Sequence, residues 1–431
     1  MARRYFGTDG IRGVVGEDLT TDLVEKIGRA AVLWAKAAGK AETGSDPGRV
    51  LIGRDTRGSG PELEATLARG ISSAGWTAVL AGVLPTPAVA LLAEDLGAVI
   101  SASHNPPEYN GVKLFDGEGR KLTDEDEEAI EELLESPARD HGGLVERLDT
   151  APKRYLRHIV DSFGSDLSGL RIGVDCANGS FSDLAPAVFE ELGAEVHAIG
   201  IAPDGTNINV GCGATDLVTL QQAVTRLGLD LGVAFDGDGD RMLAVDERGE
   251  PLDGDQILAI LALALGVDLV AVTVMTNLGF HRLMAEHGIR VVTTPVGDRY
   301  LLEALRRDGG LLGGEQSGHV VWLGNHVTGD GLAAALLLCR ALGNRELSEA
   351  ASAMPRYPQS KQNVRVGRRV LPQSILDEAD RITEELGGRG RVLVRASGTE
   401  PLVRVLAEAE TAEVAGNICA SIAALVAREL G

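Results

Sequence analysis

Aromatic residues are scarce in this chain: Phe, Trp and Tyr make up 3% of its 431 residues, so its cores must be mainly aliphatic. The four cysteines stand far apart with no Cys-x-x-Cys pair, which indicates reduced, mostly buried thiols. The longest apolar run, residues 257–265, is too short to span a membrane. The first residues contain no apolar signal region. These absences predict a cytoplasmic protein.

Positive charge is also in deficit, since the formal net charge is −22 at pH 7. Such a balance disfavours partners recognised by basic patches, so we expect neither nucleic-acid nor membrane binding. An anionic substrate would need a local concentration of cations. Six basic residues lie in glycine-rich or small-residue loops and would supply it: Arg12, Lys113, Arg241, Arg299, Arg395 and Arg404.

The length of the chain exceeds one ordinary core, and its pattern repeats. Short apolar runs at 50–53, 77–80 and 98–100 alternate with helical patterns at 61–73 and 86–96, and similar cycles follow up to about residue 313. Residues 354–363 are polar and proline-containing, which indicates a linker. We predict an α/β protein with three similar α/β domains of mixed, largely parallel sheets and a smaller C-terminal α+β domain. The predicted boundaries are 1–149, 150–250, 251–358 and 359–431.

One loop carries three carboxylates at alternate positions, Asp236, Asp238 and Asp240, separated by glycines. Hard oxygen ligands of this kind suit Mg²⁺, which commonly completes its shell with phosphate oxygens. A solvated turn is the simple alternative. An EF-hand calcium loop is a weaker one, because its sixth position needs glycine and Arg241 occupies it here.

Candidate chemistry follows a strand in each predicted α/β domain. Ser103 follows the run at 98–100, Asp236 follows 231–235, and Glu315 follows 311–313. Ligands in open α/β sheets gather beyond the carboxyl ends of strands, so this placement favours a shared site over separate turns.

A further loop, in the smaller domain, has the composition of an anion trap. Backbone amides around Ser397, Gly398 and Thr399 can form a concave nest, and Arg395 and Arg404 add fixed positive charge. We expect it to hold a phosphate that does not react, because Ser103 lies in another domain.

Taken together, the loops resemble the α-D-phosphohexomutase superfamily along essentially the whole chain. The segments occur in family order: Phe6-Gly-Thr-Asp-Gly-Ile-Arg-Gly13, Ala102-Ser-His-Asn-Pro106, Asn110-Gly-Val-Lys113, Asp236-Gly-Asp-Gly-Asp-Arg241, Gly313-Gly-Glu-Gln-Ser-Gly-His319 and Arg395-Ala-Ser-Gly-Thr-Glu-Pro-Leu-Val-Arg404. The first and fifth of these, with Val296-Gly-Asp-Arg-Tyr300, are most similar to the branch that acts on glucosamine phosphates. The resemblance implies four domains around a central cleft.

The resemblance also implies roles for single residues. Ser103 would carry the exchangeable phosphate and would ligate Mg²⁺ together with Asp236, Asp238 and Asp240. Arg241 and Arg12 would bind the transferring phosphate, and Glu315 and Ser317 would read sugar hydroxyls. Arg299, in the Val-Gly-Asp-Arg-Tyr segment, is a further substrate-binding candidate. Three further residues are catalytic candidates. Lys113 would act as acid or base on the sugar hydroxyl, and the alternative is a solvated lysine at the end of a strand. His104 would orient the serine loop, and His319 would be a second acid/base or a phosphate contact.

The resulting prediction is an enzyme that interconverts glucosamine 6-phosphate and glucosamine 1-phosphate through a phosphoserine and a sugar bisphosphate. By resemblance it would serve UDP-N-acetylglucosamine synthesis, and a homodimer is a possible assembly. Mutase activity on mannose or glucose phosphates is the nearest alternative. A metal-dependent sugar phosphatase and a silent sugar-phosphate-binding protein are alternatives of another class.

Overall fold

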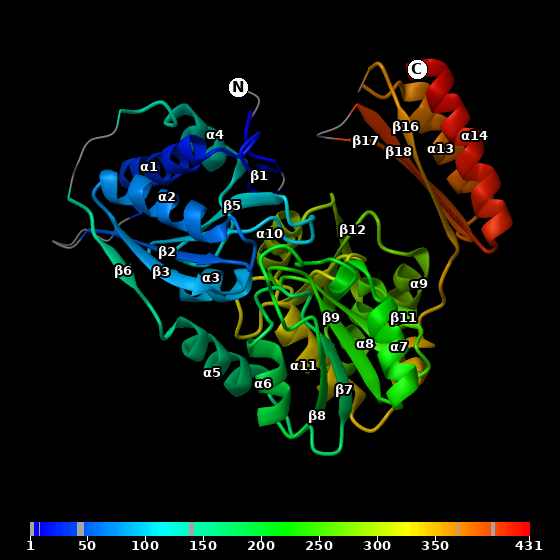
Figure 1. Cartoon of the computed structure of the whole chain (residues 1–431). Helices are drawn as coiled ribbons and strands as arrows, with labels where there is room; N and C mark the ends of the chain where they lie inside the picture. The colour runs from blue at the N-terminus through cyan, green and yellow to red at the C-terminus, as the bar shows by residue number, and fades with distance from the viewer. Residues whose placement is uncertain (1–3, 8, 41–46, 138–141, 369, 398–400) are drawn as a thin grey trace. The chain divides into compact units, whose positions relative to one another are not determined.

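The computed structural model describes residues 4–7, 9–40, 47–137, 142–368, 370–397 and 401–431 (Figure 1). The chain forms two compact units. Unit 1 comprises Met1–Met275 with Arg290–Ser352, and unit 2 comprises Thr276–Ile289 with Ala353–Gly431. Among the described residues, no helix is long and apolar enough to cross a membrane.

The first sheet of unit 1 has the strand order β1-β5-β4-β2-β3-β6. Its strands are β1 (Ile11–Val14), β2 (Arg49–Arg54), β3 (Thr77–Val83), β4 (Leu96–Ile100), β5 (Tyr109–Asp116) and β6 (Val145–Arg147). The central strands β4, β2 and β3 are parallel, whereas β5 runs antiparallel to β4 and to β1. Every residue of β4 is buried, which explains its unbroken apolar sequence.

The helices beside this first sheet are α1 (Thr21–Ala37), α2 (Gly60–Ser73), α3 (Thr86–Leu92) and α4 (Asp124–Glu132). Helices α2 and α3 pack on its strands, and α1 packs on α2 and α4. Helices α1 and α2 approach closely because glycine stands at their contact. A Cβ at Gly70 would lie 2.0 Å from the carbonyl oxygen of Glu25. Thr123 caps α4 through a capping box with Asp126.

Two further sheets complete unit 1. The second has the order β11-β10-β9-β7-β8 and the third β13-β12-β14-β15. Their strands are β7 (Arg171–Asp175), β8 (Glu195–Ile199), β9 (Leu231–Phe235), β10 (Met242–Asp246), β11 (Pro251–Leu252), β12 (Leu269–Thr273), β13 (Arg290–Thr294), β14 (Leu312–Gly314) and β15 (Val320–Trp322). The accompanying helices are α5 (Ala151–Phe163), α6 (Leu184–Glu191), α7 (Val218–Leu227), α8 (Gly254–Leu265), α10 (Asp298–Asp308), α11 (Gly331–Leu342) and α12 (Leu347–Ala351).

Unit 2 contains an antiparallel sheet of order β16-β18-β17, formed by β16 (Gln359–Arg365), β18 (Leu402–Ala409) and β17 (Gly390–Ala396). Helices α13 (Gln373–Leu386) and α14 (Ala412–Leu430) pack on one face of this sheet (Figure 1). Helix α9 (Leu278–Glu286) also belongs to this unit.

The predicted fold class of three α/β domains and a smaller C-terminal domain is confirmed, and the boundaries between the domains stay predictions. Two local predictions are wrong. The linker predicted at 354–363 ends early, because its polar residues from Gln359 onward form the edge strand β16, whose side chains are largely solvated. The helix predicted at 86–96 ends at Leu92, where Ala93 is extended and leads into β4.

Candidate active site

The loop that follows β4 holds Ser103 in a constrained conformation. Ser103 is 1% exposed and has a φ of 53°, a left-handed value that is unusual for a residue other than glycine. Its amide donates to Ser101 Oγ at 2.8 Å, and its hydroxyl donates to Asp236 Oδ2 at 2.6 Å. The second bond joins the ends of β4 and β9, as the strand-end argument predicts.

Two residues that sequence reasoning missed hold this loop. The buried guanidinium of Arg57 pairs with Asp55 and donates to four backbone carbonyls of the loop and its exit, those of Ser103, Asn105, Pro106 and Tyr109. Asp55 Oδ2 in turn accepts from Ser101 Oγ at 2.6 Å. Their position just after β2, the parallel neighbour of β4, is the signal that could have identified them.

The three aspartates converge as predicted. Single carboxylate oxygens of Asp236, Asp238 and Asp240 all lie within 4.8 Å of one another, and all three residues are buried. Burial and repulsion from Asp240 and Asp238 raise the pKa of Asp236 well above its usual value. One oxygen each of Asp238 and Asp240 is buried without a hydrogen-bond partner. Orphaned hard oxygens beside mutually repelling carboxylates fit a divalent metal ion.

Lys113 is not solvated; it is 2% exposed, near the middle of β5. Its ammonium lies 2.8 Å from Asp238, 3.2 Å from Asp240 and 3.1 Å from Asp9. Burial alone would lower its pKa, but attraction to these carboxylates outweighs burial and raises the pKa well above its usual value. The solvated alternative for Lys113 is therefore wrong.

The charge pairing continues beyond Lys113 through residues that the sequence did not single out. Asp9 also pairs with Lys121 and with Arg12, and Lys121 lies 2.6 Å from Asp298. Asp298 belongs to the Val-Gly-Asp-Arg-Tyr segment of the third predicted domain. Opposite charges therefore alternate across the site from one sheet to the next.

Both histidines of the predicted site lie near its centre. His104 Nδ1 is 3.4 Å from Ser103 Oγ, and burial together with Arg241 and Arg12 lowers its pKa to about 4. His319 forms a backbone bridge with Arg241. Its Nε2 lies 3.4 Å from Asp298, and its Nδ1 lies 4.0 Å from Asp240.

Arg241 donates its backbone amide to Asp236 at 3.2 Å, while its side chain is 24% exposed. Its guanidinium Nε, like that of Arg12, is buried without a hydrogen-bond partner. Both side chains therefore retain donors near Ser103 and the aspartates, in keeping with a contact to the transferring phosphate.

The sugar-recognition candidates are placed differently. Glu315 accepts hydrogen bonds from the Gly297 amide at 2.9 Å and from Ser317 Oγ at 3.3 Å. The two candidates Glu315 and Ser317 are therefore bonded to each other. Arg299 is largely buried and pairs with Asp124 and Glu127 of α4. This pairing directs the guanidinium of Arg299 to α4.

In unit 2, Arg395 on β17 and Arg404 on β18 are directly opposite each other. Two guanidiniums at such a position can bind one anion together. Ser397 is buried and donates its amide to the Leu402 carbonyl at 2.8 Å. Gly398 and Thr399 lie outside the described residues.

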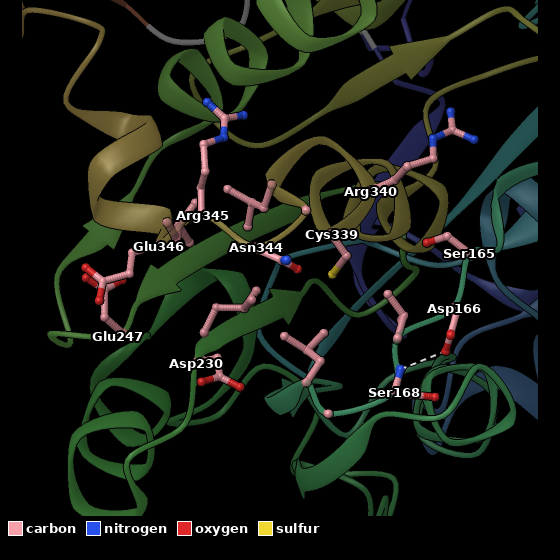
Figure 2. Close-up of a pocket in the computed structure, with 17 residues that line it drawn as sticks. Ser165, Asp166, Ser168, Asp230, Glu247, Cys339, Arg340, Asn344, Arg345 and Glu346 are labelled. Atoms are coloured by element: carbon pink, nitrogen blue, oxygen red, sulfur yellow. Dashed lines mark hydrogen bonds between the residues drawn. The ribbon is translucent and has the colours of Figure 1, made fainter.

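A cavity of about 560 Å³ lies elsewhere in unit 1 (Figure 2). Its walls come from the segments before β7 and β9 and from the end of α11, and they include Leu170, Asp230 and Cys339. It therefore lies toward the amino ends of β7 and β9. The serine and aspartate loops follow the carboxyl ends of strands, so this cavity is not part of their site.

Family models of known proteins match almost the whole chain. Family models for the phosphoglucomutase/phosphomannomutase alpha/beta/alpha domains I, II and III match residues 3–140, 153–249 and 253–357, and the model for the C-terminal domain matches 362–425. The phosphoglucosamine mutase of Moorella thermoacetica is 46% identical over 97% of this chain and 98% of its own length. That of Symbiobacterium thermophilum is 47% identical over 99% of both. A crystal structure of a phosphoglucomutase/phosphomannomutase family protein from Burkholderia thailandensis matches with a TM-score of 0.83 and 25% identity, over 98% of this chain and 97% of that one.

Proposed function

Because this chain belongs to the phosphoglucosamine mutases of the α-D-phosphohexomutase superfamily, we propose that it exchanges phosphate with its substrate through Ser103. The reaction is the interconversion of glucosamine 6-phosphate and glucosamine 1-phosphate. One observation carries the assignment to Ser103: its hydroxyl contacts Asp236 at 2.6 Å and so meets the aspartate cluster directly. In this proposal a phosphoserine at 103 gives its phosphoryl group to the sugar, and the bisphosphate intermediate returns the other phosphate to the serine.

Asp236, Asp238 and Asp240 would hold the metal, which we propose is Mg²⁺ because its donors would all be hard oxygens. An oxygen of the Ser103 phosphate would complete their set. When bound, the ion would neutralise charge on the transferring phosphate.

The chain's own residues supply the remaining functions. We assign the transferring phosphate to Arg241 and Arg12, whose guanidinium Nε groups have no hydrogen-bond partner. Lys113 would hold or move a proton at the sugar hydroxyl, since its ammonium is fixed beside the aspartates. His104 orients Ser103 Oγ, and His319 would act as a second acid/base held by Asp298.

We further propose that the non-reacting phosphate binds Arg395, Arg404, Ser397, Gly398 and Thr399 of unit 2. The facing arginines support this role, because two guanidiniums at opposed positions of one sheet can bind the same phosphate. Glu315 and Ser317 would contact sugar hydroxyls. For Arg299, the pairing with Asp124 and Glu127 supports an indirect role, in which it holds α10 against α4.

The same proposal covers the setting of the enzyme. We propose a cytoplasmic enzyme that can assemble as a homodimer and that serves UDP-N-acetylglucosamine synthesis. It would bind neither nucleic acid nor membranes. The sugar bisphosphate would act as intermediate and activator. The net charge of −22 and the four buried, free cysteines support this proposal.

The deciding experiment compares turnover of glucosamine, glucose and mannose 6-phosphates by the phosphorylated protein. The proposal expects the highest kcat/KM for glucosamine 6-phosphate, with preference rather than exclusion, because a hydroxyl can replace an ammonium as donor. Equal or higher efficiency with glucose or mannose 6-phosphate would overturn the sugar assignment. Burst release of inorganic phosphate without isomerisation would instead indicate a phosphatase.

A further inference from the structure

The amino end of α11 is docked on the back of the aspartate loop. The amide of Gly331, the first residue of α11, donates to the carbonyl of Gly239 at 3.0 Å. Gly239 stands between Asp238 and Asp240 and has a φ of 77°. A Cβ on Gly331 would lie 2.5 Å from the Arg241 carbonyl, so the contact leaves no room for a side chain. The position of α11 therefore limits where the loop can lie.

Asp330 fixes that end of α11. Its Oδ1 accepts from the amides of Leu332 and Ala333 at 2.9 and 3.1 Å, which makes it the N-cap of the helix. Its Oδ2 is free of the cap and instead accepts from the Tyr155 hydroxyl at 2.8 Å. His326 Nε2 lies 3.1 Å from the same oxygen. Asp330 is 2% exposed, so these contacts take the place of water around its side chain.

The cluster extends into α5. His158 Nε2 lies 3.2 Å from His326 Nδ1, and the two rings stack at 5.3 Å between centroids. Phe163, also on α5, contacts His326 edge-on. Tyr155, His158 and Phe163 thus hold both Asp330 and the residue that supports it.

Tyr155 reaches the aspartate loop by a second route as well. Its ring stacks on that of Phe181, with 6.4 Å between the ring centroids. The Phe181 ring in turn packs against Gly239, since a Cβ added to Gly239 would lie 2.4 Å from Phe181 Cε2. The ring route ends at Gly239, as does the hydroxyl route through Asp330 and Gly331. Replacing Tyr155 by Phe breaks only the hydroxyl route, since the ring remains.

We propose that Tyr155, Asp330 and His326 are positioning residues for the metal loop, acting through the Gly331–Gly239 hydrogen bond. None of them belongs to the proposed set of metal ligands, Asp236, Asp238 and Asp240. Gly329 carries the same effect to His319, because a Cβ at Gly329 would lie 2.2 Å from His319 Nε2. The inference rests on the proposed metal role of Asp236, Asp238 and Asp240.

The test measures binding of Mn²⁺ to metal-free protein by calorimetry, with kcat and KM measured in parallel. Mutation of a residue that directly contacts a metal ligand typically lowers metal affinity about 10- to 100-fold. A residue that acts through a further contact should have a smaller effect, so Tyr155→Phe should weaken Mn²⁺ binding about 3- to 10-fold. It should lower kcat and leave KM for the sugar phosphate unchanged. His326→Gln acts through the same Asp330 oxygen, so the double variant should show less than the combined effect of the two.

Val224→Ala is the matched control, because it opens a cavity in a core cluster that includes Leu220 and Val245 and lies apart from the Asp330 contacts. It should lower the melting temperature without changing Mn²⁺ affinity. If Tyr155→Phe and His326→Gln behave like Val224→Ala, the positioning role is wrong. If instead wild type and Asp238→Asn bind Mn²⁺ equally, the metal role itself fails, which is a different result.

Discussion

Replacing Arg57 by Lys tests whether the hydrogen bonds from Arg57 hold the serine loop in place. The arginine uses all five donors, to Asp55 and to the carbonyls of Ser103, Asn105, Pro106 and Tyr109. Lysine keeps the charge beside Asp55 but has three donors, so at least two acceptors lose this partner. At about 1–1.5 kcal/mol for each bond, the loop should lose about 2–3 kcal/mol of stability against local opening.

Hydrogen–deuterium exchange of a peptide covering residues 101–111 measures that opening. Because about 1.4 kcal/mol corresponds to a factor of ten, exchange should accelerate about 30- to 150-fold. Phosphorylation of Ser103 by the sugar bisphosphate should slow as well. Arg171→Lys is the control, since Arg171 also donates to two carbonyls, those of Gly228 and Leu227, but is 42% exposed. Water can replace its lost bonds, so exchange there should change little. Unchanged exchange at 101–111 in Arg57→Lys would refute the reasoning.

Four further predictions concern single residues. Ser103→Ala should abolish both activity and incorporation of labelled phosphate; label found at another residue on peptide mapping would contradict this. Asp238→Asn should weaken Mn²⁺ binding in calorimetry, and full activity after chelation would exclude the metal role. Arg404→Ala should cost about 1.5–3 kcal/mol in substrate capture, with more bisphosphate released into solution; unchanged kinetics and release would oppose it. Burial and Arg391 lower the pKa of His281 from 6.5 to about 4, so the stability this provides is present above pH 6.5 and is lost as pH falls through 4. Melting scans at pH 7 and pH 5 should show a smaller acid loss in His281→Gln than in wild type, while the exposed His287→Gln should match wild type.

Sequence reasoning located the residues whose neighbours along the chain define them. Ser103 and Asp236 each follow a short apolar run, and the runs are the buried strands β4 and β9. Strand direction alone then places both at carboxyl ends, where the structure joins them by one hydrogen bond. The alternate spacing of Asp236, Asp238 and Asp240 along one loop is likewise enough to predict that their carboxylates converge, as they do in the structure.

Residues defined by distant partners could not be assigned in this way. Lys113 has the sequence context of an ordinary strand lysine, and distant partners such as Asp238, 125 residues away, make it part of the site. Arg299 looks like a substrate ligand until α4 places Glu127 against it, 172 residues away. Local patterns carry no record of such pairings, so both residues needed the tertiary fold.

The charge balance of the site shows why those distant pairs matter for an acidic protein. The innermost cluster brings five carboxylates together with four cations: Asp9, Asp236, Asp238, Asp240 and Asp298 with Arg12, Lys113, Lys121 and Arg241. By formal charge this cluster is slightly negative, which disfavours a phosphosugar. A divalent ion held by the three loop aspartates turns the balance positive. The buried lysines therefore prevent the carboxylates from dominating the field, and the metal then makes the site attractive to phosphate. On this argument the aspartate loop serves the binding of the anionic substrate as well as the transfer step.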